Sequence, residues 1–316
     1  MSLPPAGGIR VPYRDLPRAV CDWVDDVLGE PVVEAVTQRG GFSPGVAARV
    51  RTAGGLRAFV KAVSAEANPR SPEMHRQEAR VTGALPDAAP APKLLSSYDD
   101  GTWVALALED IDGRHPVTPW QEAELRRVVA AVDELFTDLT PCPLADAAEV
   151  GDRWRPEFDN WRTVAAAGSP PAGLDPWTLR YLDRLAELEA QWEEAARGDT
   201  LLHLDLRADN MLVTDERVWL VDWPWAARGN PAFDLAAFCP SVAMQGGPPP
   251  AETFALSTVC RDVDPDVLRV LVATITGYFA VKALQPPPPG LPTVRAFQAA
   301  QGDVARQWLQ ELTGWP

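Results

Sequence analysis

Residues 201–210 read LLHLDLRADN and residues 221–226 read VDWPWA, and each stretch places polar side chains directly after an apolar run. In the first stretch, Asp205 and Asn210 are five positions apart, and in the second the apolar run ends on Asp222. The intervening MLVTDERVWLVD is typical of two short strands that turn at the Asp-Glu pair. Such a hairpin would return Asp222 to the side of Asn210.

This spacing suits chemistry on a phosphoryl group, which needs one carboxylate at the attacking hydroxyl and separate oxygen ligands for a metal. The pattern H-x-D-x-x-x-x-N is the spacing of a kinase catalytic loop. We therefore predict that Asp205 accepts the hydrogen of the acceptor hydroxyl and that Asn210 and Asp222 bind magnesium. His203 is expected to brace the loop rather than transfer protons. Arg207 and Asp209 are expected to be solvated loop residues.

The bulk composition indicates a globular protein large enough for two lobes, with 316 residues, of which 46% are hydrophobic and 23% charged. No apolar run approaches the roughly 18 residues that span a bilayer, and MSLPPAGGIR lacks an apolar signal segment. A cytoplasmic location is expected. The four cysteines form no CxxC pair, which favours buried free thiols over a zinc site or a disulfide framework.

The chain is acidic, with 29 basic against 44 acidic residues and a net charge of -15. This charge repels nucleic acid and anionic membranes and attracts cationic small molecules. Residues 118–200 carry carboxylates that could bind amines, although each could equally belong to a solvated helix face: Asp133, Glu134, Asp138, Glu157 and Asp159. Tryptophans in the same insert could line a pocket or pack in the core: Trp154, Trp161, Trp177 and Trp192.

The N-terminal third predicts an antiparallel sheet. A helix over residues 15–29, capped by Asp15, precedes three strands joined by glycine turns. A second helix over residues 71–86, capped by Ser71, leads to a hairpin of two more strands. From residue 118 onward the apolar spacing of three and four is helical.

The expected architecture is therefore α+β. It comprises a five-stranded antiparallel N-lobe sheet with a helix, followed by a larger, mostly helical C-lobe. We place the nucleotide-binding lobe at residues 1–110 and the helical lobe, with the catalytic loop and an acceptor-binding insert, at residues 111–316.

Lys61 is one of only three lysines in the chain and lies on a mostly apolar strand face with Phe59 and Val63. A buried ammonium needs a partner. Glu78 on the following helix is the candidate. Glu73 is the alternative, although a carboxylate in the first helical turn can serve the helix dipole alone.

Taken together, LLHLDLRADNMLV and LVDWPWAARGNPAFDLAAF resemble the aminoglycoside phosphotransferase family within the protein-kinase-like superfold. The upstream features follow in the order of that fold. The resemblance implies ATP as phosphoryl donor, with GTP possible, and Mg2+. It implies that Glu78 orients Lys61 toward the α- and β-phosphates, and that Asp234 anchors the catalytic loop, although Asp234 could also cap its helix.

The same resemblance assigns further nucleotide contacts. The turn GGFSPG would bring backbone N–H groups and the Ser43 hydroxyl to the phosphates, through the glycines Gly40, Gly41 and Gly45. Residues Glu109 to Ile111 would form the hinge that meets the adenine through one backbone acceptor and one donor. Glycine-rich hairpins are also common as plain turns.

Two positions depart from the family pattern. Leu204 replaces the glycine of H-G-D, and the D-F-G position is Asp222-Trp223-Pro224. Because Pro224 fixes its own φ and restricts Trp223, in/out movement of this segment is not expected.

Only eleven residues, 223–233, separate Asp222 from Asp234, and no A-P-E motif follows. A protein kinase needs a longer activation segment there to dock a peptide. We therefore expect a small hydroxylated acceptor, plausibly a cationic antibiotic such as an aminoglycoside, which would imply antibiotic resistance. The alternatives are a choline- or homoserine-kinase-like metabolic enzyme acting on an amino alcohol, amino acid or sugar, and a catalytically silent pseudokinase. A monomer and a homodimer both remain open.

Overall fold

The structure, a computed structural model, describes residues 7–38, 40–42 and 44–316. Its N-terminal part is a five-stranded antiparallel sheet in the order β1-β2-β3-β5-β4. The strands are β1 (Val32–Thr37), β2 (Val46–Thr52), β3 (Arg57–Ser64), β4 (Leu94–Asp99) and β5 (Trp103–Leu108). The helix α2 (Ser71–Ala84) follows β3, so the predicted order of strands and helix is confirmed.

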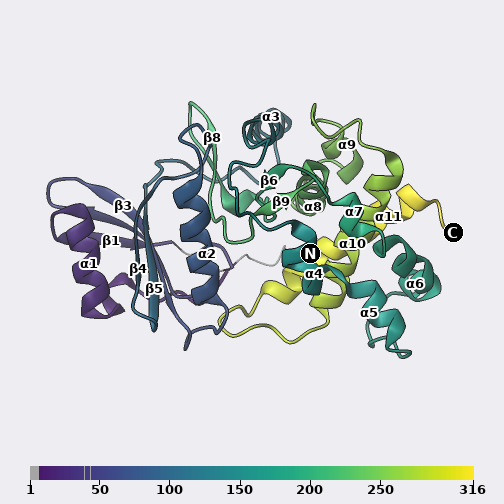
Figure 1. The fold of residues 1–316 in the computed structure, drawn as a ribbon, viewed down its shortest axis with the longest axis horizontal. Helices are drawn as coiled ribbons and strands as arrows, with labels where there is room; N and C mark the ends of the chain where they lie inside the picture. The colour runs from purple at the N-terminus through teal and green to yellow at the C-terminus, as the bar shows by residue number, and fades with distance from the viewer. Residues whose placement is uncertain (1–6, 39, 43) are drawn as a thin grey trace.

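Two helices cover the opposite faces of this sheet (Figure 1). The first, α1 (Arg18–Leu28), buries Val20, Val24 and Leu28 against the β-branched and alanine side chains of β2 and β3. On the other face lies α2, which packs on β3, β4 and β5. The face under α2 holds Lys61, because successive side chains of β3 point to opposite sides.

The starts of both helices differ from the prediction. Asp15 belongs to a short 3-10 turn, and Pro17 occupies the N-cap of α1. At α2 the Asn68 side chain accepts hydrogen bonds from the backbone N–H groups of Arg70 and Ser71, at 3.0 and 3.2 Å. An asparagine three residues earlier thus supplies the cap expected of Ser71. At its other end α1 stops as predicted, at Gly29 with φ 72°.

The C-terminal part is helical. Its helices are α3 (Glu122–Asp138), α4 (Val150–Phe158), α5 (Asn160–Ala166), α6 (Pro176–Glu189), α7 (Trp192–Ala195), α8 (Pro231–Met244), α9 (Pro250–Phe254), α10 (Pro265–Ala283) and α11 (Val294–Thr313). Two strand pairs interrupt them: β6 (Thr200–Leu202) with β9 (Ala227–Gly229), and β7 (Met211–Val213) with β8 (Val218–Leu220). The observed architecture is the predicted α+β arrangement. The exact division at residue 110 stays a prediction.

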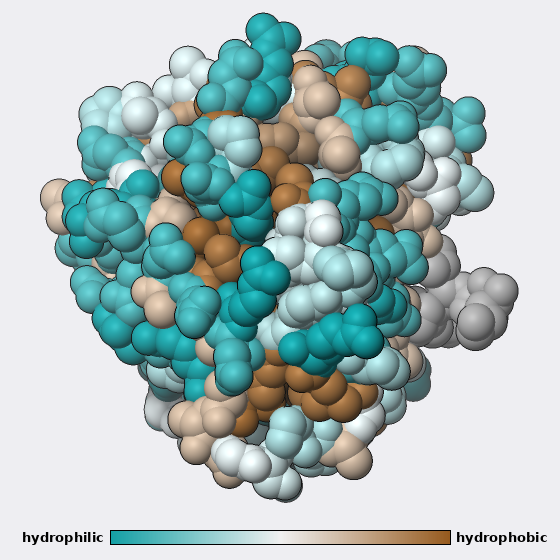
Figure 2. All heavy atoms as spheres, turned by 90° about the vertical axis from the view of Figure 1, so that its right-hand side faces the viewer, coloured by the Kyte–Doolittle hydropathy of each residue, from teal (hydrophilic) through white to brown (hydrophobic). Residues whose placement is uncertain are grey.

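The core of the helical part is continuous and rich in tryptophan. Trp161 and Trp192 are fully buried, and the Trp161 Nε1–H donates to the carbonyl of Ala273 on α10 at 2.8 Å. Hydrophilic residues cover most of the outer end of this part, with hydrophobic residues gathered in patches between them (Figure 2). No helix among the described residues is long and apolar enough to cross a membrane.

Candidate active site

The β7–β8 hairpin returns Asp222 to the catalytic loop as predicted. Met211 pairs with Leu220, and the Val221 N–H donates to the carbonyl of Asn210 at 3.0 Å. Asn210, Asp222 and Lys61 line one cavity between the sheet and the helical part, which we call the nucleotide cavity. The three residues come from segments up to 161 positions apart.

Asp234 holds the catalytic loop in place through hydrogen bonds. Its carboxylate accepts the backbone N–H groups of His203, at 2.7 Å, and Leu204, at 3.0 Å. Burial raises the pKa of Asp234 to about 7, although both N–H donors oppose the shift. Asn230 caps α8 through the N–H of Ala232, so Asp234 is not needed as a helix cap.

His203 lies fully buried inside the loop that it braces. Its Nε2 bonds the Val221 carbonyl at 3.0 Å, and its Nδ1 accepts the Asp205 N–H at 3.2 Å. Because Nδ1 accepts, Nε2 carries the proton of a neutral ring. Burial lowers the pKa of His203 to about 4, which keeps the ring neutral near pH 7. These contacts fit the bracing role expected for this histidine.

Two non-glycine residues at this site adopt the left-handed region, Leu204 at φ 60° and Asp222 at φ 69°. Such conformations cost about 1–2 kcal/mol and concentrate at functional sites. Leu204 therefore occupies, with strain, the backbone conformation that the family's glycine adopts readily.

Asp205 lies beside Asn210 and Arg207. The Asn210 amide nitrogen donates to the Asp205 carboxylate at 2.8 Å and to its carbonyl at 2.9 Å. The amide oxygen of Asn210 is then available to a metal. Burial raises the pKa of Asp205 to about 6, with the Arg207 guanidinium opposing the shift.

Arg207 and Asp209 are not solvated, so that prediction is wrong. Their side chains are only 13% and 16% exposed and form a two-bond pair at 2.8 and 2.9 Å. Arg207 also reaches the Asp205 carboxylate at 3.3 Å and lies 4.9 Å over the Phe42 ring. The local sequence gives no sign of this burial, because the covering rings come from distant segments.

Lys61 pairs with Glu78 at 2.5 Å and with Asp222 at 2.6 Å. The alternative partner, Glu73, is exposed and lies beside Arg76. Burial favours a neutral amine, but the two carboxylates outweigh it and raise the pKa of Lys61. Burial alone would raise the pKa of Asp222. The Lys61 ammonium outweighs this effect and lowers the pKa of Asp222 to about 2.

The glycine turn is held by a segment that the sequence did not suggest. Residues 7–11, the N-terminal arm, run beside it: Gly8 N–H donates to the Gly41 carbonyl, and Val11 N–H to that of Gly45. Gly41 and Gly45 have φ of 82° and 92°. Arg10 donates to the Gly40 carbonyl and lines the nucleotide cavity, where burial lowers its pKa and the charge of Asp222 opposes that shift. Ser43 lies outside the described residues.

The hinge segment also lines the nucleotide cavity, including Glu109 and Ile111. The Glu109 N–H donates to the Lys93 carbonyl at 2.8 Å, and the Ile111 carbonyl accepts from Gly113 N–H. Within the described ranges, the Glu109 carbonyl and the Ile111 N–H have no backbone partner. Asp110, in the middle of the predicted hinge, pairs with Arg49 on β2 at 2.6 Å, a contact that the sequence did not predict.

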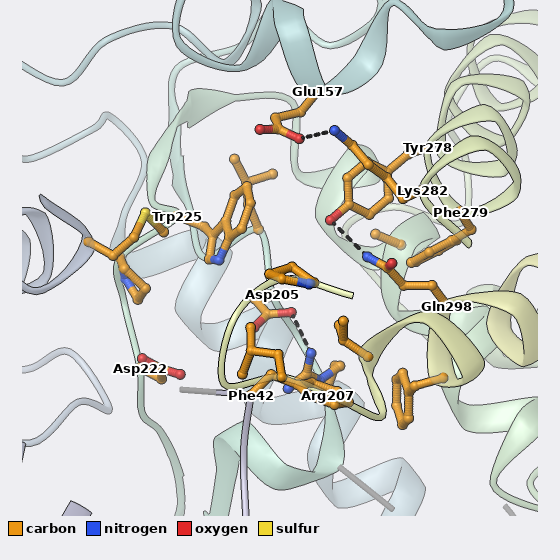
Figure 3. A pocket seen from close by; sticks show the side chains of 18 of the residues that line it. Phe42, Glu157, Asp205, Arg207, Asp222, Trp225, Tyr278, Phe279, Lys282 and Gln298 are labelled. Atoms are coloured by element: carbon orange, nitrogen blue, oxygen red, sulfur yellow. Dashed lines mark hydrogen bonds and ion pairs between the residues drawn. The ribbon is translucent and has the colours of Figure 1, made fainter. Parts of the chain in front are cut away.

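A second cavity, which we call the acceptor cavity, lies on the other side of Asp205 and also reaches Asp222 (Figure 3). The largest share of its lining comes from α10, α11 and the segment between them, and α2 and the catalytic loop add further residues. The insert 118–200 contributes Glu157 and Phe158 alone among its described residues. The insert therefore provides little of this cavity's wall, because α10 and α11 pack across the catalytic loop instead. That the insert binds the acceptor stays a prediction.

Most of the predicted acceptor-binding side chains have other partners. The Asp133 carboxylate accepts from the Thr258 N–H at 2.6 Å, and Asp159 accepts from Trp192 Nε1 at 2.8 Å. Glu134 and Asp138 line a separate hollow on α3. Of the five candidate carboxylates, only Glu157 reaches the acceptor cavity.

The tryptophan at the acceptor cavity is Trp225, which the sequence analysis did not select. Trp154 supports it from behind, with ring centroids 4.4 Å apart and a hydrogen bond of 2.9 Å from Nε1 to the Trp225 carbonyl. Trp161 and Trp192 are core residues, and Trp177 stacks on Trp315. The available signal was a second tryptophan after Asp222, three residues further along the chain.

The donor set fits magnesium bound together with a nucleotide. Asn210 and Asp222 offer an amide oxygen and a carboxylate in the same cavity, and Mg2+ typically takes one or two carboxylates plus phosphate oxygens. In the part of the chain that the structure describes, no three His, Cys, Asp or Glu side chains are grouped so as to hold a metal ion. A magnesium ion would therefore depend on these two residues and on the phosphates.

Comparison with known proteins gives a family match and solved structures of similar fold. A sequence model described as the phosphotransferase enzyme family matches residues 37–270. The fold resembles aminoglycoside phosphotransferase APH(4)-Ia solved with ADP and hygromycin B, with a TM-score of 0.59 at 16% identity over 91% of this chain and 98% of that one. It also resembles choline kinase LicA from Streptococcus pneumoniae, with a TM-score of 0.58 at 13% identity over 92% and 98% of the two chains.

Similarity to a curated sequence is local. Protein LicA of Haemophilus influenzae is 30% identical over 85 residues, which cover 26% of this chain and 24% of LicA. The match therefore spans only a quarter of that relative, and the likeness to the solved structures is one of fold.

Proposed function

Because the chain belongs to the phosphotransferase enzyme family, as its sequence resemblance predicted, we propose that it transfers the γ-phosphoryl group of ATP to a hydroxyl group of a small molecule. The observation that carries this proposal is the position of Asp205 and Asp222. Asp222 lines both cavities, and Asp205 lies at the acceptor side of the same junction.

The nucleotide would bind between the hinge and the catalytic loop. An adenine edge presents one donor and one acceptor, which match the Glu109 carbonyl and the Ile111 N–H. Lys61, oriented by Glu78, would contact the phosphates. Asn210 and Asp222 would hold Mg2+, which when bound neutralises charge on the β- and γ-phosphates.

At the acceptor side, Asp205 would orient the hydroxyl and take its proton. The hydroxyl oxygen forms a bond to the γ-phosphorus, the bond to the β–γ bridging oxygen breaks, and ADP leaves with that electron pair. Arg207, 3.3 Å from the Asp205 carboxylate, provides a fixed cation beside the transferring group. Its two-bond pair with Asp209 fixes its position.

The short segment after Asp222 favours a small acceptor over a protein. Residues 223–230 form a tight turn and β9 before α8 begins at Pro231. Trp223 is buried and donates from Nε1 to the Leu220 carbonyl at 2.9 Å. Nothing in this stretch resembles a platform for a peptide.

The test is release of ADP that depends on both Mg2+ and acceptor, over a panel of hydroxylated compounds that includes aminoglycosides, choline, homoserine and hydroxy acids. Wild type should turn over at least one class, and Asp205→Asn should not. Tight Mg2+-dependent ATP binding with no turnover of any hydroxylated compound would instead indicate a pseudokinase and contradict the proposal.

A further inference from the structure

The side chains around the acceptor cavity differ in charge from the molecule as a whole. Among the described residues, four cationic side chains line it: Arg70, Arg207, Lys282 and Arg295. The carboxylates of this described lining are Glu78 and Asp222, which pair with Lys61, and Glu157 and Asp205. Asp205 is the proposed base and lies beside Arg207.

Glu157 is shared by two of these cations. Lys282 Nζ lies 2.8 Å from Oε2 and Arg70 lies 3.1 Å from Oε1, so both carboxylate oxygens are engaged. Burial raises the pKa of Glu157, but these two cations outweigh it and lower the pKa, which keeps the group ionised. The cluster of Glu157, Arg70 and Lys282 therefore carries a net positive charge.

Arg295 adds a further positive charge at the start of α11. Its guanidinium donates to neutral oxygens, the Pro286 carbonyl at 3.1 Å and the Gln298 side chain at 2.8 Å. Within the described ranges no carboxylate lies within ion-pair distance of it. Burial lowers the pKa of Arg295, and Tyr278 and the Glu157 charge oppose that shift without cancelling it. A bound anion would therefore stabilise this cation further.

Between the Glu157–Lys282 pair and Asp205, aromatic side chains form the wall of the cavity. Figure 3 shows Trp225 on one side of the cavity and Tyr278 and Phe279 on the other, with the Glu157–Lys282 pair apart from Asp205. Aromatic walls of this kind suit the body of a flat or apolar molecule.

We propose that the acceptor is an anionic hydroxylated compound: a carboxylic acid with an apolar or aromatic body. The hydroxyl faces Asp205, the body packs against Trp225 and Tyr278, and the carboxylate binds Lys282 and Arg295. This inference rests on the proposed phosphotransfer.

A cationic acceptor meets the opposite situation. An ammonium group at this end of the cavity would face Lys282 and Arg295, and the one carboxylate there, Glu157, already has two cationic partners. Cation–π contact with the rings could attract a quaternary ammonium by about 0.5–2 kcal/mol, but Lys282 and Arg295 would oppose it at short range. The chain's acidic charge acts at longer range and is screened beyond about 8–10 Å.

The test uses three compounds of one shape: 3-(hydroxymethyl)benzoate, its carboxamide and the corresponding benzylamine. Their binding is measured by calorimetry to the full chain loaded with Mg2+ and a non-hydrolysable ATP analogue, and their turnover by ADP release. The benzoate should bind about tenfold more tightly than the amine, with the carboxamide between them.

Arg295→Gln should reduce the preference for benzoate over carboxamide by about tenfold, and Arg295→Lys should retain most of it. Lys282→Gln is a second variant with the same expected direction. Arg261→Gln is the matched control, because Arg261 does not line this cavity and its exposed side chain pairs with exposed Asp262.

Tighter binding of the amine, equal binding of all three compounds, or no binding of the benzoate would each overturn the inference, as would an unchanged preference in Arg295→Gln. Selective binding of the benzoate without turnover of any compound would leave the inference standing and contradict the proposed phosphotransfer instead.

Discussion

At the scale of single residues, Asp205 and Asp222 are chemically alike but lie in different surroundings. Asp205 contacts Asn210 and Arg207, whereas Asp222 contacts the Lys61 ammonium. The first is assigned to the acceptor hydroxyl and the second to the metal. Their substitutions should therefore affect different steps.

Asp205→Asn should lower kcat by about 100- to 10,000-fold, the usual contribution of a positioned general base, with ATP affinity changed little. Asp222→Ala should instead abolish Mg2+-dependent ATP binding. Turnover assays and calorimetry on both variants measure the two effects. Asp262→Asn, at a side chain 90% exposed, is the control. Equal loss of ATP binding in both variants would contradict the assignment.

Asp205 also predicts the pH dependence of turnover. Burial raises its pKa to about 6, and only the ionised form can take the hydroxyl proton. Activity should therefore be full above that pKa and fall about tenfold for each pH unit below it. Measurement of kcat/KM from about pH 5 to about pH 8 tests this profile. A flat profile across this range would remove Asp205 as the base.

At the scale of elements, the N-terminal arm lies beside the glycine turn, although residue 10 falls outside the matched segment 37–270. Arg10 brings a cation into the nucleotide cavity. Arg10→Ala should weaken ATP binding by about tenfold and leave adenosine binding unchanged, since only the phosphates carry charge. Arg14→Ala, with a side chain 86% exposed, is the matched control. Equal losses for ATP and adenosine would indicate a structural role for Arg10.

The elements also show what could be predicted from the sequence. Glycine turns bound β2 and β3, and strand parity placed Lys61 on the face that α2 covers, so Glu78 could be selected correctly. Arg10 could not be found, because the arm has no periodicity. The burial of Arg207 was not predicted, because one of the rings that cover its guanidinium, Phe297 on α11, lies ninety positions away in the sequence. Helical periodicity identified buried faces but not which side chains reach a cavity.

At the scale of the whole molecule, net charge was a poor guide to local charge. The chain carries -15, yet among the described residues four cations line the acceptor cavity, where Arg70 and Lys282 share one carboxylate, Glu157. No carboxylate of the described chain lies within ion-pair distance of the fourth wall cation beside them, Arg295. Surface carboxylates dominate the total, whereas a ligand responds to the few groups within a Debye length, about 8–10 Å. The prediction of a cationic acceptor came from the total charge, from the carboxylates of residues 118–200 and from the family resemblance, whereas the proposed anionic acceptor comes from the wall.

Two buried carboxyl groups in the helical part give a prediction about the stability of the whole molecule. Glu189 accepts the backbone N–H groups of Asn160, Trp161 and Arg162 at the start of α5. Burial raises its pKa to about 7, as it does for Asp234. Both groups bind protons more tightly in the folded state than in the unfolded state. Their contribution to stability is therefore complete below about pH 4 and is lost as the pH rises through about 7.

The melting temperature should accordingly fall by a few degrees, on the order of 2–4 °C per kcal/mol lost, between about pH 5 and 8. Glu189→Gln should reduce this slope, because an amide oxygen can still accept N–H donors but cannot ionise. Glu187→Gln, two residues away on the same helix and outward-facing, should leave the slope unchanged. Thermal unfolding followed by circular dichroism across this range measures both. Because Asp234 still contributes, Glu189→Gln should reduce the slope without removing it, and a slope of unchanged size would contradict the role of Glu189.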